Sequence, residues 1–249
     1  MQRTLAAAFV AATLLLAACG PSATPTPGAT SSGATTVPSE APATAPPATG
    51  SASVGPTTVA PPAGTLPWPG TFAVEMTPGT YFTTPPFVIP MTVPMSEAGW
   101  YAGHINPTFI DLQRFDGVEV GSFPNRMIGF GWPENVRDSS GPVPAAGLTP
   151  AAAIDILTGR GSLKSGERAA VELLGLQGER IDLHSDLGNN PIFGTSDGDF
   201  GLGPELDMRL AVLPLGDGLL MVATLATADD LDDAWEQALA ILGEVELVE

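Results

Sequence analysis

The chain has 249 residues, and its 27 acidic residues outnumber its 9 basic residues, which gives a formal net charge of −18. We expect no nucleic-acid partner, because binding to phosphates requires a surface rich in Lys and Arg. The single cysteine excludes a disulfide within the chain and a structural metal site built from several cysteines.

Residues 1–18 have the pattern of a secretory signal peptide. Arg3 supplies a positive charge, and the apolar run that follows it ends at Ala18. About fourteen apolar residues form roughly 21 Å of helix, which is shorter than a hydrocarbon core of about 30 Å. The pattern therefore predicts an export signal rather than a permanent membrane span.

The end of this segment, Leu16-Ala17-Ala18-Cys19, resembles the lipobox of bacterial lipoprotein precursors. The resemblance implies a diacylglyceryl group on the Cys19 thiol and cleavage that makes Cys19 the mature N-terminus. We expect a protein that is lipid-anchored at the cell membrane, on its extracytoplasmic face. The alternative is an ordinary signal peptide beside an unmodified cysteine, which would be a reactive thiol outside the cell.

Residues 19–66 consist almost entirely of Pro, Ser, Thr, Ala and Gly, and Glu40 carries the only charge. Without aromatic residues this segment cannot bury enough apolar surface to offset the entropy of ordering, so it predicts a disordered linker. As a flexible coil its ends would lie roughly 35–40 Å apart, which is enough to hold a domain away from the membrane.

Residues 67–249 are expected to form a single acidic globular domain, with 8 of the 9 basic and 26 of the 27 acidic residues. Runs of β-branched and aromatic residues predict strands early in this domain. Asp116-Gly117 predicts a turn into one more strand. The predicted strands are 80–84, 87–94, 109–115, 118–121 and 126–130.

The second half of the domain predicts two helices and two hairpins. Thr149 and Pro150 are typical of a helix start, and Gly159 is typical of a stop, so we expect a helix over 151–158. Apolar residues then recur at helical spacing after Thr227, before a closing strand. The hairpins are 169–174 with 178–184 and 208–215 with 219–225; the helical apolar residues are Leu231, Trp235, Ala238, Leu239 and Leu242; the last strand is 244–249.

These elements predict an α+β fold in which an antiparallel sheet is covered on one face by two helices. Their order, from Gly79-Thr80-Tyr81 and Gly99-Trp100 to the Trp-bearing last helix, resembles an uncharacterised exported domain of lipoproteins from high-GC bacteria. It also resembles the PsbP/Mog1-like sandwich. The resemblance covers most of residues 70–249 and implies an accessory role outside the cytoplasm, and it implies no catalytic residues.

Two acidic segments have residues that could ligate a metal ion. In an EF-hand loop that starts at Asp197, the sixth position would be Leu202 rather than Gly and the twelfth Met208 rather than Glu, so the pattern favours an Asp/Gly turn around Asp197 and Asp199. The acidic residues of 229–233 are typical of a first helical turn, where they complement the helix dipole. We expect no metal and no cofactor.

The segment His184-Ser185-Asp186 contains the residue types of a catalytic triad, but the chain has no Gly-x-Ser-x-Gly nucleophile elbow. We therefore expect no enzyme but a non-catalytic binding or accessory domain, with an envelope protein or a cell-wall component as partner. The alternatives are a carrier of a small, lipid-like ligand, which needs a cavity of about 300–1,000 Å³, and a hydrolase. The candidate binding residues are Trp100, Tyr101, His104 and Trp132, although the tryptophans could instead fill the core.

Overall fold

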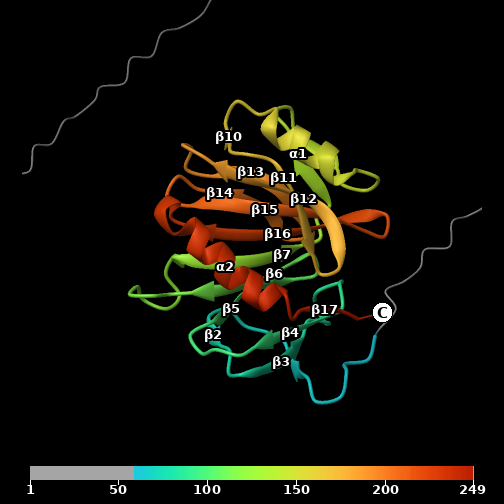
Figure 1. The fold of residues 1–249 in the computed structure, drawn as a ribbon, viewed down its shortest axis with the longest axis vertical. Helices are drawn as coiled ribbons and strands as arrows, with labels where there is room; N and C mark the ends of the chain where they lie inside the picture. The colour runs from blue at the N-terminus through green and yellow to red at the C-terminus, as the bar shows by residue number, and fades with distance from the viewer. Residues whose placement is uncertain (1–58, 249) are drawn as a thin grey trace, which may run out of the picture. The chain divides into compact units, whose positions relative to one another are not determined.

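The computed structural model describes residues 59–248 of the chain, and Figure 1 shows their arrangement. The predicted signal peptide, Cys19 and most of the predicted linker lie outside these residues. Within them the secondary structure is mostly antiparallel β-sheet with two α-helices, so the fold class is α+β, as predicted. The described residues include no helix of sufficient length and apolar character to span a membrane.

The centre of the domain is a large antiparallel sheet. Alternating apolar residues place one set of side chains on each of its faces. Its strands, in spatial order, are β10 (Lys164–Ser165), β12 (Leu176–His184), β15 (Asp207–Leu215), β16 (Gly218–Ala226), β7 (Arg126–Gly131), β6 (Phe109–Arg114), β5 (Tyr101–Asn106) and β2 (Val74–Glu75), and β11 (Ala169–Leu173) also pairs with β12. The predicted hairpins β11–β12 and β15–β16 are confirmed.

Two smaller sheets accompany the central one. The first has the order β1 (Leu66–Pro67), β3 (Gly79–Phe82), β4 (Met91–Met95) and β17 (Glu246–Leu247). The second has the order β14 (Gly198–Leu202), β13 (Asn190–Thr195), β8 (Asn135–Arg137) and β9 (Pro142–Pro144). The β13–β14 hairpin lies in a segment for which the sequence predicted no strands.

The two helices begin and end close to the predicted residues. α1 (Pro150–Thr158) starts after Thr149, whose hydroxyl accepts a hydrogen bond from the Ala152 amide at 3.2 Å, and Gly159 follows its last residue. A single 3₁₀ turn, η1 (Ala228–Asp230), precedes α2 (Leu231–Leu242). The apolar spacing of α2 is the reason that Trp235 and its neighbours face the sheet.

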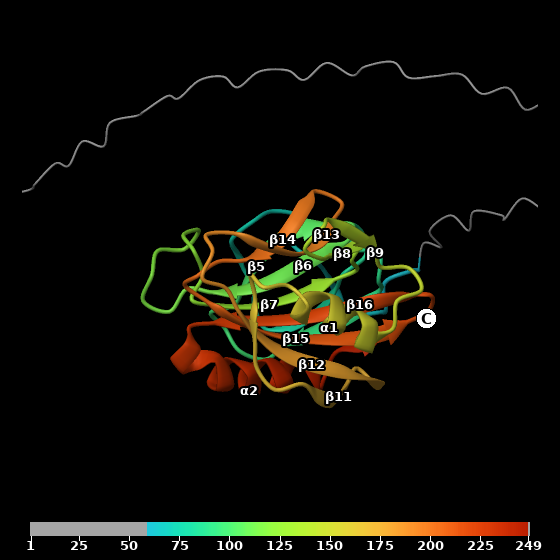
Figure 2. The same ribbon diagram turned by 90° about the horizontal axis from the view of Figure 1, so that it is seen from above.

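The prediction that both helices cover one face of the sheet is wrong. On β15, Ala211 and Leu213 pack in one apolar cluster with Trp235 of α2, whereas Leu210 and Val212 pack in another with Ile154 of α1. Because neighbouring residues of a strand point to opposite faces, the helices cover opposite faces, as Figure 2 shows. Period-2 patterns show that a strand has two faces but not which helix covers each.

Residues 118–121 do not form the predicted strand. β6 and β7 are instead joined by a loop over 115–125, which extends from the side of the sheet in Figure 1. Residues 116–123 are all exposed, Val118 and Val120 by 44% and 46%, so neither face of this segment is buried. Gly117 and Gly121 both have positive φ angles, which interrupt an extended chain.

Candidate functional site

A cavity of about 520 Å³ lies on the face of the central sheet that α1 also covers. Its floor comes from β5, β6, β7 and β16, and its walls come from the β13–β14 hairpin and the loop 115–125. Most of the lining surface is apolar, and it comes from Phe72, Ile105, Phe109, Phe123, Pro124, Met127, Phe200, Leu206 and Leu225. Such a lining suits a ligand with an apolar body.

The β13–β14 hairpin is held over the sheet by hydrogen bonds and by stacked rings. The Ser196 amide donates to the Thr108 hydroxyl at 2.7 Å, and the Ser196 hydroxyl donates to Asn106 Oδ1 at 3.2 Å. The ring of Phe200 lies 4.7 Å from that of Phe109 and 4.9 Å from that of Phe193, measured between centroids. These contacts fix the wall of the cavity relative to its floor.

A β-bulge in β5 brings His104 to the cavity. Ala102 pairs with Leu112 and Ile105 with Ile110, so two residues of β5, Gly103 and His104, lie opposite the single Asp111 of β6. An extra residue of this kind redirects a side chain that regular pairing would send to the other face. His104 Nδ1 lies 3.4 Å from Asp111 Oδ2, and the His104 side chain is 68% exposed.

Asp111, Gln113 and His104 form a polar group in the floor, which we call the Asp111 cluster. The Asp111 side chain has no exposed surface, and its Oδ2 accepts a hydrogen bond from Gln113 Nε2 at 3.1 Å. Asp111 Oδ1 and Gln113 Oε1 are buried without a hydrogen-bond partner. Buried acceptors without a partner are costly, so their presence in a native fold requires a structural or functional explanation.

Gly103 has no side chain, and the Asp111 carboxylate occupies the space that a side chain at position 103 would fill. A Cβ atom at position 103 would lie 1.8 Å from Asp111 Oδ1 and 2.5 Å from Gln113 Nε2, far closer than atoms can approach. Any other residue at this bulge would displace the Asp111 cluster.

Neighbouring charged groups shift the pKa of His104 and form an ion pair at the rim of the cavity. The hydrogen bond to Asp111 raises the pKa of His104, against the opposing effect of desolvation. On the rim, Arg137 Nε donates to Asp199 Oδ1 at 2.9 Å, so this carboxylate already has a cationic partner. Within residues 59–248, no group of three or more His, Cys, Asp or Glu side chains is placed to hold a metal ion.

The four candidate binding residues are not brought together. His104 lines the cavity. Trp100 is 3% exposed in the core beneath α2, and Trp132 is half-buried against the same core, so the tryptophans take the alternative left open by the sequence. Tyr101 packs edge-on against Phe115, with their ring centroids 5.3 Å apart. Of these four residues, His104 is the one that lines the cavity.

The sequence analysis did not predict that Asp111 and Gln113 belong to the site, although the alternation pattern of their strand indicates it. The alternation of β6 places both residues on the same face as Phe109, where an otherwise apolar strand presents two polar side chains. Phe72, Phe123 and Phe200 carried no such signal, because they come from separate loops and a hairpin that only the tertiary fold brings together.

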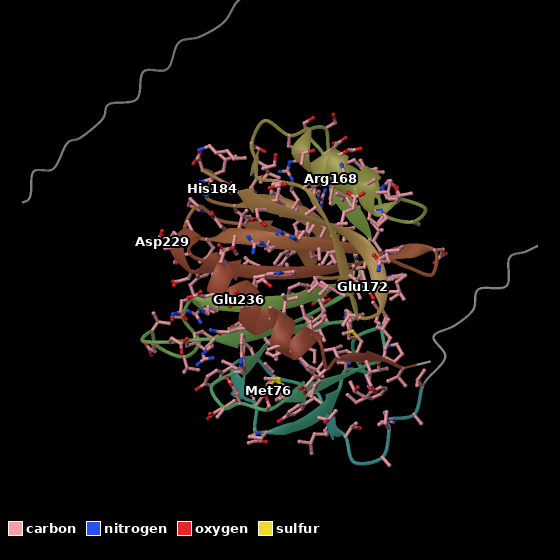
Figure 3. All side chains as sticks on the ribbon, viewed as in Figure 1. Met76, Arg168, Glu172, His184, Asp229 and Glu236 are labelled. Atoms are coloured by element: carbon pink, nitrogen blue, oxygen red, sulfur yellow. The ribbon has the colours of Figure 1, made fainter. Side chains whose placement is uncertain are left out.

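His184, the other histidine, lies on the surface at the end of β12, and Figure 3 shows it on the same side of the domain as Asp229. Its Nδ1 lies 2.6 Å from Asp207 Oδ1 and its Nε2 lies 3.0 Å from Asp186 Oδ1. The hydrogen bond to Asp207, with a second one to Asp186, raises the pKa of His184. Ser185 is buried and hydrogen-bonded to the Leu187 amide, so the three neighbours in sequence do not form a triad.

No family model and no curated protein matches the chain by sequence. Its structure is similar to cyanobacterial PsbP (CyanoP) from Synechocystis sp. PCC 6803, with a TM-score of 0.38 and 8% identity over 72% of this chain and 95% of that one. It is also similar to the Saccharomyces cerevisiae Ran-binding protein Mog1p, with a TM-score of 0.36 and 14% identity over 64% of this chain and 90% of that one. A third neighbour is LpqN, involved in cell envelope biogenesis of Mycobacterium tuberculosis, with a TM-score of 0.32 and 11% identity over 70% of this chain and 91% of that one.

These neighbours include PsbP and Mog1, the two proteins that give their names to the sandwich that the order of elements resembles.

Proposed function

We propose that this protein is a lipid-anchored, non-catalytic binding domain on the outer side of the cell membrane, which takes up a small, largely apolar ligand in the cavity. The export signal and Cys19 in a lipobox sequence support the anchor and the location. The predicted linker over 19–66 would give the domain reach to an envelope partner. The net charge of −18 supports the absence of a nucleic-acid partner.

The cavity is the observation that carries this proposal. Its volume of about 520 Å³ is in the range of sites for small molecules. Two of its lining residues, Phe72 and Phe123, are 47% and 62% exposed. Large exposed aromatic side chains beside an apolar cavity are typical of a binding site, because water contact makes them unfavourable until a ligand covers them.

The hydrogen bonding of His104 supports binding rather than a reaction. Its ring bonds to Asp111, and among the described residues no hydroxyl or thiol is hydrogen-bonded to it. A nucleophile activated by a base requires such a bond. We therefore propose that His104 belongs to the binding site, beside the Asp111 carboxylate, and does not act in catalysis.

The test is a single change at the mouth of the cavity. Phe123→Ala removes an exposed ring without opening the core, so the fold should persist while the contact with the ligand is lost. We expect the affinity for a neutral fluorescent apolar probe, N-phenyl-1-naphthylamine, to fall by about fivefold or more, since a buried aromatic contact contributes about 1 kcal/mol or more. The control Leu187→Ala changes a side chain that is 50% exposed and lies outside the cavity. Equal effects of the two substitutions would refute this site.

A further inference from the structure

The polar atoms without partners beneath the cavity have one chemical character. Both Asp111 Oδ1 and Gln113 Oε1 are hydrogen-bond acceptors, and both residues are at most 1% exposed. A ligand group that satisfies them must donate hydrogen bonds. Bonds from a charged donor to a carboxylate are roughly twice as strong as those between neutral groups.

The charges around the cavity favour a cation. Among the described residues that line it, His104 is the one basic side chain, whereas Asp197 and Asp199 are acidic. Asp111 adds a third carboxyl group from below, and Arg137 pairs with Asp199 alone of the three. A carboxylate or phosphate head group would meet like charges here, and a protonated amine would meet opposite ones.

The side chain that contacts Asp111 from the cavity can move aside. His104 is 68% exposed, and its distance of 3.4 Å from Asp111 Oδ2 is long for a hydrogen bond. Rotation of this ring toward solvent costs little packing, because within residues 59–248 its aromatic contact is with the exposed Phe72, at a centroid distance of 5.5 Å. A head group can therefore take the place of the imidazole beside Asp111.

We infer that the ligand is an amphiphile with a protonated amine, whose head group binds Asp111 and Gln113 in place of His104 while its apolar body lies against Phe109, Phe123 and Phe200. This inference rests on the proposed function and adds the chemical class of the ligand to it. The amine supplies three donors, which match the two unpartnered acceptors and Asp111 Oδ2.

The test compares three probes of equal chain length, n-decylamine, 1-decanol and decanoate, by isothermal titration calorimetry at pH 8. The protein is the full chain with Cys19→Ala, so that no acyl group competes for the cavity. At this pH the amine is protonated and the carboxylate is ionised. Added salt of about 0.3 M screens attraction by the acidic surface as a whole. We expect decylamine to bind about tenfold or more tightly than either other probe.

Two variants locate the preference. Asp111→Asn should make decylamine and decanol bind equally while decanol binding persists. Asp207→Asn, the matched control, removes a carboxylate from the other His–Asp pair outside the cavity and should leave the preference intact. The inference is overturned if decanoate binds as tightly as decylamine, or if the preference survives in Asp111→Asn. If Asp111→Asn fails to fold, the relative affinities of the three probes for the protein with intact Asp111 still test the inference.

Failure of the proposed function would look different. If none of the three probes binds, the cavity is not a site for apolar ligands, and both the proposed function and this inference fall. If all three bind with similar affinity, the proposed function stands and the amine class is wrong.

Discussion

Asp111 combines two features that seldom occur together, complete burial and an unpartnered carboxylate oxygen. The cost of taking such a group out of water is large unless bonds replace those to solvent. Gln113 supplies one such bond, and His104 supplies a long one. The Asp111 cluster therefore stores unfavourable energy that a donor group could release on binding.

Gly103→Ala tests whether the Asp111 cluster requires this glycine. Because the new methyl group would lie 1.8 Å from Asp111 Oδ1, β5 or the carboxylate must shift. We expect the free energy of unfolding, measured by urea denaturation, to fall by about 1–3 kcal/mol. The control is Gly161→Ala, where nothing lies within 4 Å of the added atom. Equal stability of the two variants would contradict the close approach.

The two histidines predict how stability depends on pH. The pKa of His184 is raised chiefly by its hydrogen bond to Asp207, and that of His104 by its hydrogen bond to Asp111. Each protonated ring therefore stabilises the folded state fully below the ordinary histidine pKa of 6.5, and this contribution is lost as pH rises through the raised pKa. We expect the thermal midpoint to fall from pH 6 to pH 9.

Substitutions of the two histidines distinguish their contribution to the pH dependence of stability from that of the other titratable groups. His184→Gln and His104→Gln should each flatten this pH dependence, and the double variant should flatten it most. A midpoint that rises over the same interval in the unsubstituted protein would be incompatible with the raised pKa values. Thermal unfolding followed by circular dichroism is sufficient to measure it.

At the scale of the elements, local signals were enough for the two helices and for the β11–β12 and β15–β16 hairpins, but not for their packing. Thr149 with Pro150 predicted α1, and the alternation in β15 and β16 predicted their hairpin. No local signal indicates which helix covers which face of the sheet. The apolar spacing of a helix and the alternation of a strand show only that one side of each element is buried. The β13–β14 hairpin was missed because Pro191, Gly194 and Gly198 are typical of a loop, and its strands are stabilised by pairing with β8 and by stacked rings.

Arg209 joins three elements and predicts how α2 is held. Its guanidinium donates two hydrogen bonds of 2.7 Å to Asp182 on β12, lies 2.9 Å from Asp232 on α2, and lies over the ring of Trp235 at 5.8 Å. Arg209→Met leaves Asp182 without this partner. We expect the free energy of unfolding to fall by about 2 kcal/mol, less than for a fully buried pair because Asp182 is partly exposed.

The matched control for Arg209 is Lys164→Met. The ion pair of Lys164 with Asp186 joins side chains that are 68% and 63% exposed, so its loss should leave the urea midpoint within error. Arg209→Lys should recover only part of the stability, because an ammonium group cannot form the two parallel bonds. If Arg209→Met proved as stable as Lys164→Met, this contact would not hold α2 to the sheet.

At the scale of the whole molecule, the proposed anchor and the binding domain occupy separate parts of the chain. The residues of the predicted lipobox lie outside the described residues, and the cavity lies within them. We expect cells that express the protein and are given radiolabelled palmitate to label it, and Cys19→Ser to abolish the label. Labelling that persists in Cys19→Ser would contradict an anchor on this thiol.

The central claim is that the cavity binds an apolar ligand, and amide chemical-shift mapping by NMR during titration with 1-decanol tests it most directly. The account predicts saturable shifts at His104, Gly198 and Gly201, which line the cavity. Gly216 and Gly243, which lie in other surface hollows, should not move. Shifts centred on Gly216 or Gly243, or shifts that never saturate, would contradict it.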